Sequence, residues 1–241
     1  DLVRSRGLGD VYKRQEVARA AKAFNAMQGR INHYMAERMQ ILAAISHDLQ
    51  TPITRMRMRA DMLDDSEQRE KLNHDLKEME VLVKEGVAYA RTLHGTSEPP
   101  CALDPDALLE SLVFDYTDAG QKLELHGKVG HSITTRPNAL RRVLINLIDN
   151  ALKFSTQVEL RAGEGADGRI IIQVLDNGPG IPEAELEAVF QPFYRVEASR
   201  NRDTGGTGLG LAIARQLAQA MNAGLSLHNR TAGGLEARLV L

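Results

Sequence analysis

The chain has 241 residues, 43% of them hydrophobic, and its 30 Lys and Arg residues nearly balance 32 Asp and Glu residues, for a formal net charge of −2. Nucleic acid selects a strongly basic face, so this balance argues against nucleic-acid binding. The single cysteine, Cys101, excludes an internal disulfide and favours a reducing compartment. No apolar run approaches the ~20 residues of a membrane span, so we expect one or two soluble domains.

The first third of the chain has the composition of helices, because residues 16–93 contain only two glycines and one proline. Apolar residues recur there in steps of three and four on two segments separated by a polar turn, which predicts a hairpin of two helices. The stripes are Ile45, Leu49, Ile53, Met56, Ala60 and Leu63, and then Leu72, Leu76, Met79, Val83, Gly86, Ala90 and Leu93. Ser66 is the expected N-cap of the second helix. Because two helices make a thin core, we expect an antiparallel hairpin that forms a four-helix bundle as a homodimer.

A Pro-Pro pair at residues 99–100 predicts a stiff linker over residues 96–103. Beyond it, short β-like runs alternate with helical ones. The expected strands are residues 132–135, 157–162, 170–175, 225–228 and 236–240, and the expected helices are residues 104–117, 138–154 and 208–220. This alternation predicts an α/β sandwich over residues 104–241, with helices on one face of a mixed sheet, and an α+β class for the whole chain.

The expected helix at residues 138–154 carries two amides and an ammonium along one edge. At ~100° per residue, Asn146, Asn150 and Lys153 fall within about 60° of one another and off the apolar stripe. An amide oxygen can ligate Mg²⁺, and a lysine can meet phosphate. A solvated polar face is the alternative interpretation.

Asp176 directly follows the apolar run 170–175 and precedes Gly178 and Gly180. A carboxylate at a strand end, beside glycines that let a ligand approach the backbone closely, is a suitable acceptor for the exocyclic amine of adenine. An ordinary turn is the other interpretation, because Asn-Gly and Pro-Gly pairs mark turns.

Glycines cluster at residues 205–210, where the last expected helix begins. Backbone N–H groups at the positive end of a helix form an anion site that suits phosphates. The order of residues fits neither the P-loop nor the dinucleotide fingerprint. The preceding polar stretch, residues 195–204, has the composition of a mobile lid. Residues 190–195 would anchor this lid, or would equally form a small aromatic core patch.

His47 is the most informative residue of the helical part. It points about 160° away from the stripe of Ile45 and Leu49, so we expect it on the exposed face, with Thr51 about 40° from it. The neighbouring Asp48 can orient the ring or take its proton, and the Thr51 hydroxyl follows one turn later. Exposed histidines usually have no such role, and the other six histidines keep that interpretation.

Together and in this order, these segments resemble the sensor histidine kinases of two-component signalling, over residues 35–241. Gln50 stands where that family usually has arginine, and residues 222–224 (Asn-Ala-Gly) stand where it usually has His-Gly-Gly, but neither change removes a reacting group. The matching segments are the H box at residues 46–52, the N box at 146–154, the G1 box at 176–180, the F box at 190–193 and the G2 box at 206–210.

The resemblance implies that His47 is phosphorylated from ATP, with Asp48 engaging the other ring nitrogen, and that the phosphoryl group passes to an aspartate of a separate response regulator. Thr51 would orient water for a phosphatase activity. In the ATP-binding fold shared with gyrase and heat-shock chaperones, Asp176 would bind the adenine amine and Asn150 the Mg²⁺. The remaining nucleotide contacts would be Asn146, Lys153, Phe154, Gly178, Gly180, Arg195, Gly206, Thr207, Gly208, Leu209 and Gly210.

Residues 16–34 resemble the second helix of a HAMP linker, which joins membrane spans to such kinases, and residues 35–95 the phosphotransfer domain. The resemblance therefore implies the cytoplasmic portion of an inner-membrane receptor. Residues 1–15 match neither pattern, and we expect a non-native or disordered tail.

Two other classes share part of this pattern. A gyrase-type or chaperone-type ATPase would have the nucleotide pocket but no use for His47, and its general base is usually a glutamate where this chain has Asn146. A non-catalytic scaffold would bind ATP or a partner without transferring phosphate.

Overall fold

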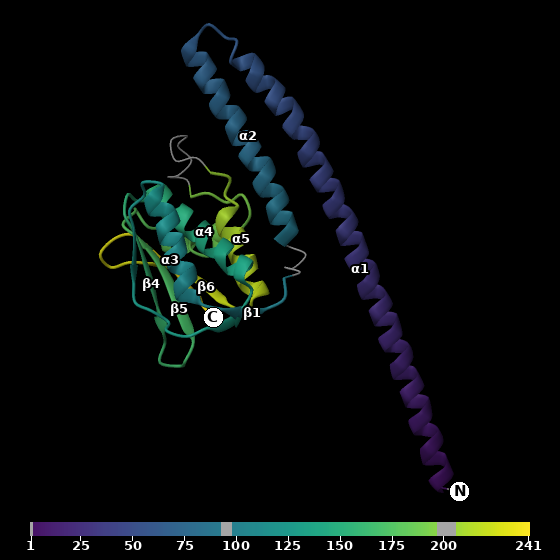
Figure 1. Ribbon diagram of the computed structural model, residues 1–241. Helices are drawn as coiled ribbons and strands as arrows, with labels where there is room; N and C mark the ends of the chain where they lie inside the picture. The colour runs from purple at the N-terminus through teal and green to yellow at the C-terminus, as the bar shows by residue number, and fades with distance from the viewer. Residues whose placement is uncertain (1, 93–97, 197–205) are drawn as a thin grey trace. The chain divides into compact units, whose positions relative to one another are not determined.

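The computed structural model describes residues 2–92, 98–196 and 206–241 (Figure 1). By internal contacts the chain divides into two units, Asp1–Asp48 and Leu49–Leu241. From Leu2 onward, the first unit is part of the long helix α1 (Leu2–Ala60), which is unbroken at residues 15 and 16. The backbone therefore shows no boundary between the predicted tail (residues 1–15) and the predicted HAMP helix (residues 16–34), and both assignments stay predictions. Within the described ranges, no helix is both long and apolar enough to cross a bilayer.

The predicted hairpin is confirmed in the second unit, where α2 (Ser66–Thr92) follows the end of α1. Ile53, Ala60 and Leu76 form a small buried cluster between the two helices. Arg57 donates a hydrogen bond to Glu80 over 2.8 Å. Hydrogen bonds from Lys84 and Arg57 lower the pKa of Glu80 to about 2. The Glu80 carboxylate that joins the two helices therefore stays ionised at neutral pH.

The cap of α2 is Asp65, and the prediction of Ser66 is wrong. Asp65 Oδ1 accepts hydrogen bonds from the backbone N–H groups of Glu67 at 3.0 Å and Gln68 at 3.1 Å. Serine and aspartate are about equally good N-caps, so the pattern alone does not choose between adjacent candidates.

Half of the described members of the two predicted apolar stripes stay exposed in the single chain. The exposed members retain between 37% and 49% of their accessible surface, although they lie in register with the buried ones. They are Ile45, Leu49, Met56, Leu63, Leu72 and Met79. Aligned apolar surface of this kind on a helical hairpin is typical of a face that meets another chain.

The sheet of the C-terminal domain has five strands in the order β2-β4-β5-β7-β6. The β2–β4 pair is parallel and the other three pairs are antiparallel. A separate antiparallel pair joins β1 to β3. The strand bounds are β1 Cys101–Leu103, β2 Leu123–His126, β3 Ile133–Thr135, β4 Val158–Glu164, β5 Ile170–Asp176, β6 Gly224–Asn229 and β7 Leu235–Val240.

Three helices cover one face of this sheet (Figure 1): α3 (Pro105–Asp118), α4 (Pro137–Phe154) and α5 (Gly210–Ala220). The core forms because alternate strand residues point toward the helices, as the burial of Val158, Leu160 and Ala162 on β4 shows. The α4 stripe packs against them, and its members are Ala139, Leu140, Val143, Leu144, Leu147, Ile148 and Ala151. This layered arrangement confirms the predicted α+β class.

The structure also contains elements that the pattern did not predict, namely β1, β2 and two short 3₁₀ turns, η1 (Glu183–Glu185) and η2 (Ala188–Phe190). β1 and β2 have three and four residues, too few to show a clear period in the sequence, although the equally short β3 lies within the predicted strand at residues 132–135. The turn between β4 and β5 is closed by the Gly165 N–H, which donates to the Arg169 carbonyl at 2.8 Å. Gly168 provides the positive φ of 76° that this turn requires.

Candidate active site

His47 lies on the solvent side of α1, as predicted, and its side chain is 82% exposed. Its Nδ1 lies 3.5 Å from Asp48 Oδ1. Thr51, four residues further along the helix, is exposed as well. The helix therefore presents an imidazole with a carboxylate beside one of its nitrogens, leaving Nε2 open to an incoming group.

Asn146, Asn150 and Lys153 lie off the buried stripe of α4, as predicted, with both amides half-buried. Asn146 Nδ2 donates to the Arg142 carbonyl at 2.7 Å. Its Oδ1 is left 3.3 Å from the place that a β-carbon at Gly210 would take. The Asn150 side chain makes no hydrogen bond within the described residues, so its amide oxygen is available as a ligand.

Asp176 ends β5, where its side chain is buried to 5% exposure. Its Oδ1 accepts hydrogen bonds from the backbone N–H groups of Gly178 at 2.8 Å and Leu235 at 3.1 Å. Gly180, at a φ of +74°, lets the chain turn immediately afterwards. The predicted acceptor is therefore a buried carboxylate whose position is fixed by main-chain donors.

The end of α4 meets the loop that follows β5. A β-carbon at Gly178 would come within 3.0 Å of the Phe154 carbonyl oxygen. Ser155 Oγ accepts from the Asn177 N–H at 3.3 Å. The N box and the G1 box, more than twenty residues apart in sequence, thus share one wall of the site.

The G2 box also lies against side chains of α4. A side chain at Gly206 would collide with Lys153 Nζ, which places the ammonium against the first of these glycines. The Thr207 hydroxyl accepts from the Leu209 N–H at 3.2 Å and donates to Glu85 of α2. Leu209 itself is fully buried, so it anchors the start of α5 in the core.

The F box joins the G2 box through the backbone. Phe193 N–H donates to the Gly208 carbonyl at 3.0 Å, and both residues have positive φ, 64° and 74°. Positive φ is unfavourable for phenylalanine, so surrounding contacts must hold this turn. Phe190 is buried beneath the guanidinium of Arg215, and Phe193 is exposed. Arg195 is half-buried, while most of the predicted lid falls outside the described residues.

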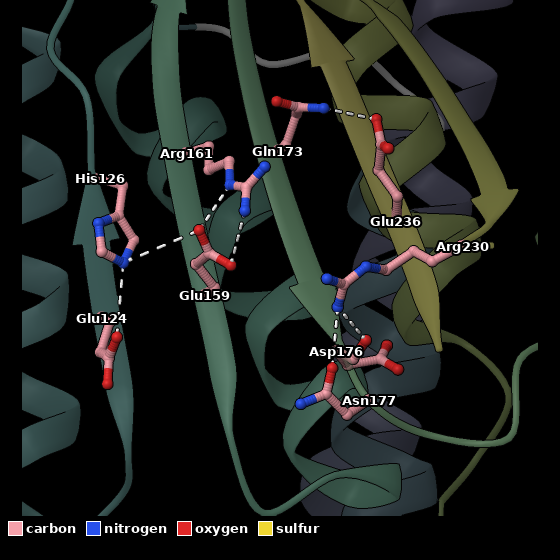
Figure 2. Close-up of polar contacts among 9 residues, drawn as sticks. All are labelled: Glu124, His126, Glu159, Arg161, Gln173, Asp176, Asn177, Arg230 and Glu236. Carbon is pink, nitrogen blue, oxygen red and sulfur yellow. Dashed lines mark hydrogen bonds and ion pairs between the residues drawn. The ribbon is translucent and has the colours of Figure 1, made fainter. Parts of the chain in front are cut away.

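Sequence reasoning missed the turn between β6 and β7, which contacts the G1 loop. Figure 2 shows the guanidinium of Arg230 directed at Asp176 and Asn177 from this turn. Asn229 bonds the backbone of Ile181 on the same loop. The Gly233-Gly234 pair was a visible signal, but it predicts only a turn and not what the turn touches.

Two family models match this chain, one over the helical hairpin and one over most of the C-terminal domain. Residues 37–91 match the family described as His Kinase A (phospho-acceptor) domain. Residues 135–241 match the family described as Histidine kinase-, DNA gyrase B-, and HSP90-like ATPase. The helical hairpin with His47 and the domain with Asp176 are therefore recognised independently.

Two relatives from bacteria match almost the whole chain. Sensor histidine kinase GtrS of Pseudomonas aeruginosa is 39% identical over 228 residues, which cover 94% of this chain and 46% of that protein. Sensor protein RstB of Escherichia coli is 34% identical over 224 residues, covering 90% and 51%. The chain belongs to the sensor histidine kinases. It spans about half the length of these relatives.

Solved histidine kinases share the fold. Full-length ShkA in complex with AMPPNP aligns with a TM-score of 0.61 at 24% identity, over 83% of this chain and 45% of that one. The histidine kinase AdeS of Acinetobacter baumannii aligns with a TM-score of 0.56 at 23% identity, over 81% and 96%. Because the phospho-acceptor match accompanies the ATPase match, the sensor kinase family is favoured over a gyrase-type or chaperone-type ATPase.

Proposed function

We propose that this sensor kinase chain transfers the γ-phosphoryl group of ATP to His47 and then passes it to an aspartate of a response regulator. The observation that carries the proposal is the state of His47. It is an exposed imidazole beside a carboxylate, within the phospho-acceptor match of a chain that also has the ATPase domain. An ATPase of the gyrase type has no need of an exposed histidine beside a carboxylate on a helical hairpin.

The nucleotide contacts of the proposal follow the clusters in the C-terminal domain. Asp176 accepts the adenine amine, and Phe154 packs near the base. Lys153 and Arg195 meet phosphate oxygens. The backbone of the G2 box closes over the triphosphate, and the close approach of Gly206 to Lys153 and of Gly210 to Asn146 supports this role. The remaining contacts are Asn146, Gly178, Gly180, Thr207, Gly208 and Leu209.

The residues present also fit Mg²⁺. Within the described ranges, no three His, Cys, Asp or Glu side chains are grouped to hold a metal. Mg²⁺ usually takes one or two protein oxygens and completes its shell with phosphate and water, so the unpartnered Asn150 amide is a sufficient donor. When bound, the metal neutralises charge on the phosphates.

In the transfer step, the Nε2 lone pair of His47 forms a bond to the γ-phosphorus as the bond from phosphorus to the β,γ-bridging oxygen breaks and ADP leaves. Asp48 beside Nδ1 favours the tautomer that carries its proton there and stabilises the positive ring that results. Positioning and charge neutralisation account for most of the catalysis in such transfers.

Thr51 supports a second activity of the same helix. Its exposed hydroxyl lies one turn beyond His47, too far to act as the base for the imidazole. It is suited to orienting a water against the phosphoaspartate of a bound regulator. The proposed kinase is therefore also a phosphatase.

The exposed apolar stripe of the hairpin supports a homodimer in which two hairpins form one four-helix bundle. We further propose that the chain is the cytoplasmic portion of an inner-membrane receptor, with a HAMP helix at residues 16–34. The relatives are about twice as long as the matched region, which supports the part of this proposal that makes the chain one portion of a longer protein.

Incubation with γ-labelled ATP and Mg²⁺ tests the proposal. Label that is acid-labile and alkali-stable on the protein is expected for the wild type, and none for His47→Gln, which should keep its nucleotide affinity because His47 is remote in sequence from the nucleotide clusters. His33→Gln, an exposed histidine on the same helix, is the matched control and should be labelled normally. Released phosphate without labelled protein would indicate an ATPase, and neither product would indicate a scaffold.

A further inference from the structure

The loop that follows β5 is held from outside by the turn between β6 and β7. At the far end of the loop, Asn229 pairs with the backbone of Ile181. Its Oδ1 accepts from the Ile181 N–H at 2.9 Å, and its Nδ2 donates to the Ile181 carbonyl at 2.6 Å. There is no room for a side chain at Gly180, because a β-carbon there would lie 2.7 Å from Asn229 Oδ1. Asn229, the last residue of β6 before the turn, therefore fixes where the loop ends.

At the near end of the loop, the same turn holds Asp176. Arg230 Nη1 donates to the Asp176 carbonyl at 2.7 Å and to Asn177 Oδ1 at 2.9 Å (Figure 2). Gly234, at a φ of +95°, packs so closely on the Asp176 carbonyl that any β-carbon would collide with it. One guanidinium thus joins two consecutive residues of the loop to the turn.

The two oxygens of the Asp176 carboxylate have different hydrogen-bonding environments. Both of its recorded donors, Gly178 N–H and Leu235 N–H, point to Oδ1. Asp176 Oδ2 receives no donor from the described residues, and the side chain is only 5% exposed. Oδ2 is therefore the accessible oxygen of an otherwise buried side chain, and an acceptor in that position favours a ligand that brings a donor.

We propose that Arg230 is a positioning residue for purine selection: it holds Asp176 so that Oδ2 is presented to an amino group at position 6 of the base and rejects a 6-oxo group. This inference rests on the proposed binding of ATP at Asp176. The discrimination arises because Oδ2 is only an acceptor. A 6-amino group donates to it, whereas a carbonyl at the same place would face it with another acceptor and leave both unpaired.

Arg230 contributes through geometry and not through its own contact with the base. Without the guanidinium, the Asp176 carbonyl and the Asn177 amide lose their shared donor, and the carboxylate is free to rotate about a less constrained backbone. Arg230→Lys can restore one of the two hydrogen bonds. Arg230→Met keeps the length of the stem but restores neither.

The test measures the dissociation constants of ATP and inosine triphosphate, with Mg²⁺, for the whole chain by calorimetric titration. Inosine triphosphate has a 6-oxo group and an N1–H donor where ATP has a 6-amino group and an N1 acceptor. Both constants are measured on the same preparation, so any loss of folded protein cancels in their ratio. Arg161→Met is the matched control, because Arg161 lies on the same sheet and bonds only to Glu159 in Figure 2.

We expect the wild type to prefer ATP by about 10-fold or more. Arg230→Met should reduce this preference at least about 5-fold, mainly by weakening ATP binding, with partial recovery in Arg230→Lys and no change in Arg161→Met. An unchanged ratio in Arg230→Met would overturn the inference. So would failure of both Arg230 variants to fold, because Arg230 would then be structural.

The variant Asp176→Asn tests the proposed contact between Asp176 and the base separately from the role of Arg230. The asparagine amide can donate to a 6-oxo group, so this variant should lose or reverse the preference for ATP. If the wild type has no preference, or if Asp176→Asn leaves it unchanged, the base contact assigned to Asp176 is wrong and the role of Arg230 is lost with it. If only Arg230→Met leaves the preference intact, Asp176 keeps its role and Arg230 does not have one.

Discussion

Glu98 accepts two hydrogen bonds from Asn138, one from its backbone N–H at 3.1 Å and one from its side-chain Nδ2 at 2.8 Å. The Ala139 N–H donates to the same carboxylate at 3.3 Å. These donors belong to the first turn of α4, where free N–H groups and the helix dipole favour a negative charge. Arg136, the N-cap residue of α4, makes no side-chain capping bond, so the linker supplies the cap of the helix that carries the N box.

Replacing Glu98 should therefore destabilise the ATP-binding domain. We expect Glu98→Ala to lower the free energy of unfolding by about 0.5–2 kcal/mol, and Glu98→Gln to lower it less, because glutamine keeps an acceptor oxygen but loses the charge. Urea unfolding of the whole chain measures both. Glu110→Ala, an exposed position on α3, is the control and should have little effect. Equal loss in the Gln and Ala variants would argue that only the charge matters.

The exposed apolar stripe predicts which methionine of α1 supports the dimer. Met56 lies on the stripe and Met58 lies off it, although Met58 is the more exposed of the two, at 61% against 38%. Met56→Glu should shift the protein toward monomer because it places a charge in an apolar seam, whereas Met58→Glu should not. Sedimentation velocity over a range of concentrations distinguishes them. Dimerisation that responds to Met58 and not to Met56 would place the interface on another face.

Asn150 should control the metal dependence of nucleotide binding. Asn150→Ala removes the amide oxygen assigned to Mg²⁺, so the gain in ATP affinity on adding Mg²⁺ should shrink while affinity without metal changes little. Titrations of ATP with Mg²⁺ and with EDTA measure the two values. Gln219→Ala, an exposed amide on α5, is the control. A full metal-dependent gain in Asn150→Ala would remove this residue from the metal site.

Thr51→Ala should separate the two proposed activities. His47 labelling should persist, but dephosphorylation of the regulator should slow by at least about 10-fold, because a group that orients water is lost. Thr54→Ala is a close control, since Thr54 is also exposed and its hydroxyl is occupied by the Gln50 carbonyl at 2.9 Å. Circular dichroism checks the helix, because Pro52 already removes one backbone donor there. Dephosphorylation at the wild-type rate would show that Thr51 does not orient the water.

Tyr116 should ionise at a higher pH than an ordinary tyrosine side chain. Burial first, and then its hydrogen bond to Asp149 at 2.5 Å, raise the pKa of Tyr116 above its ordinary value near 10. The neutral phenol is favoured in the folded state, so its contribution to stability is complete below about pH 10 and is lost as the pH rises toward the folded pKa. Absorbance at 295 nm against pH, wild type minus Tyr116→Phe, isolates this residue. A difference curve centred on the ordinary value would contradict the prediction.

The parts of the fold that could be predicted are those that repeat along the sequence. The α4 stripe and the alternation along β4 follow one period for long enough to be recognised. The glycines and amides of the nucleotide clusters can be recognised from their residue types. Asp65 could not be preferred to Ser66, because both are good caps. Arg230 could not be predicted at all. Its two partners lie 54 and 53 positions away, and one of them is a main-chain carbonyl, which every residue has.

The turn between β4 and β5 offers a place to attach a fluorescent reporter. It lies at the opposite end of β5 from Asp176, and a strand of seven residues at ~3.3 Å each separates the two by roughly 20 Å. Ala166 in this turn is exposed, and the exposed Cys101 is the single native cysteine. Ala166→Cys in a Cys101→Ser background would therefore carry one dye on the edge of the domain, clear of the base site, from which rotation of the domain during turnover can be followed by anisotropy.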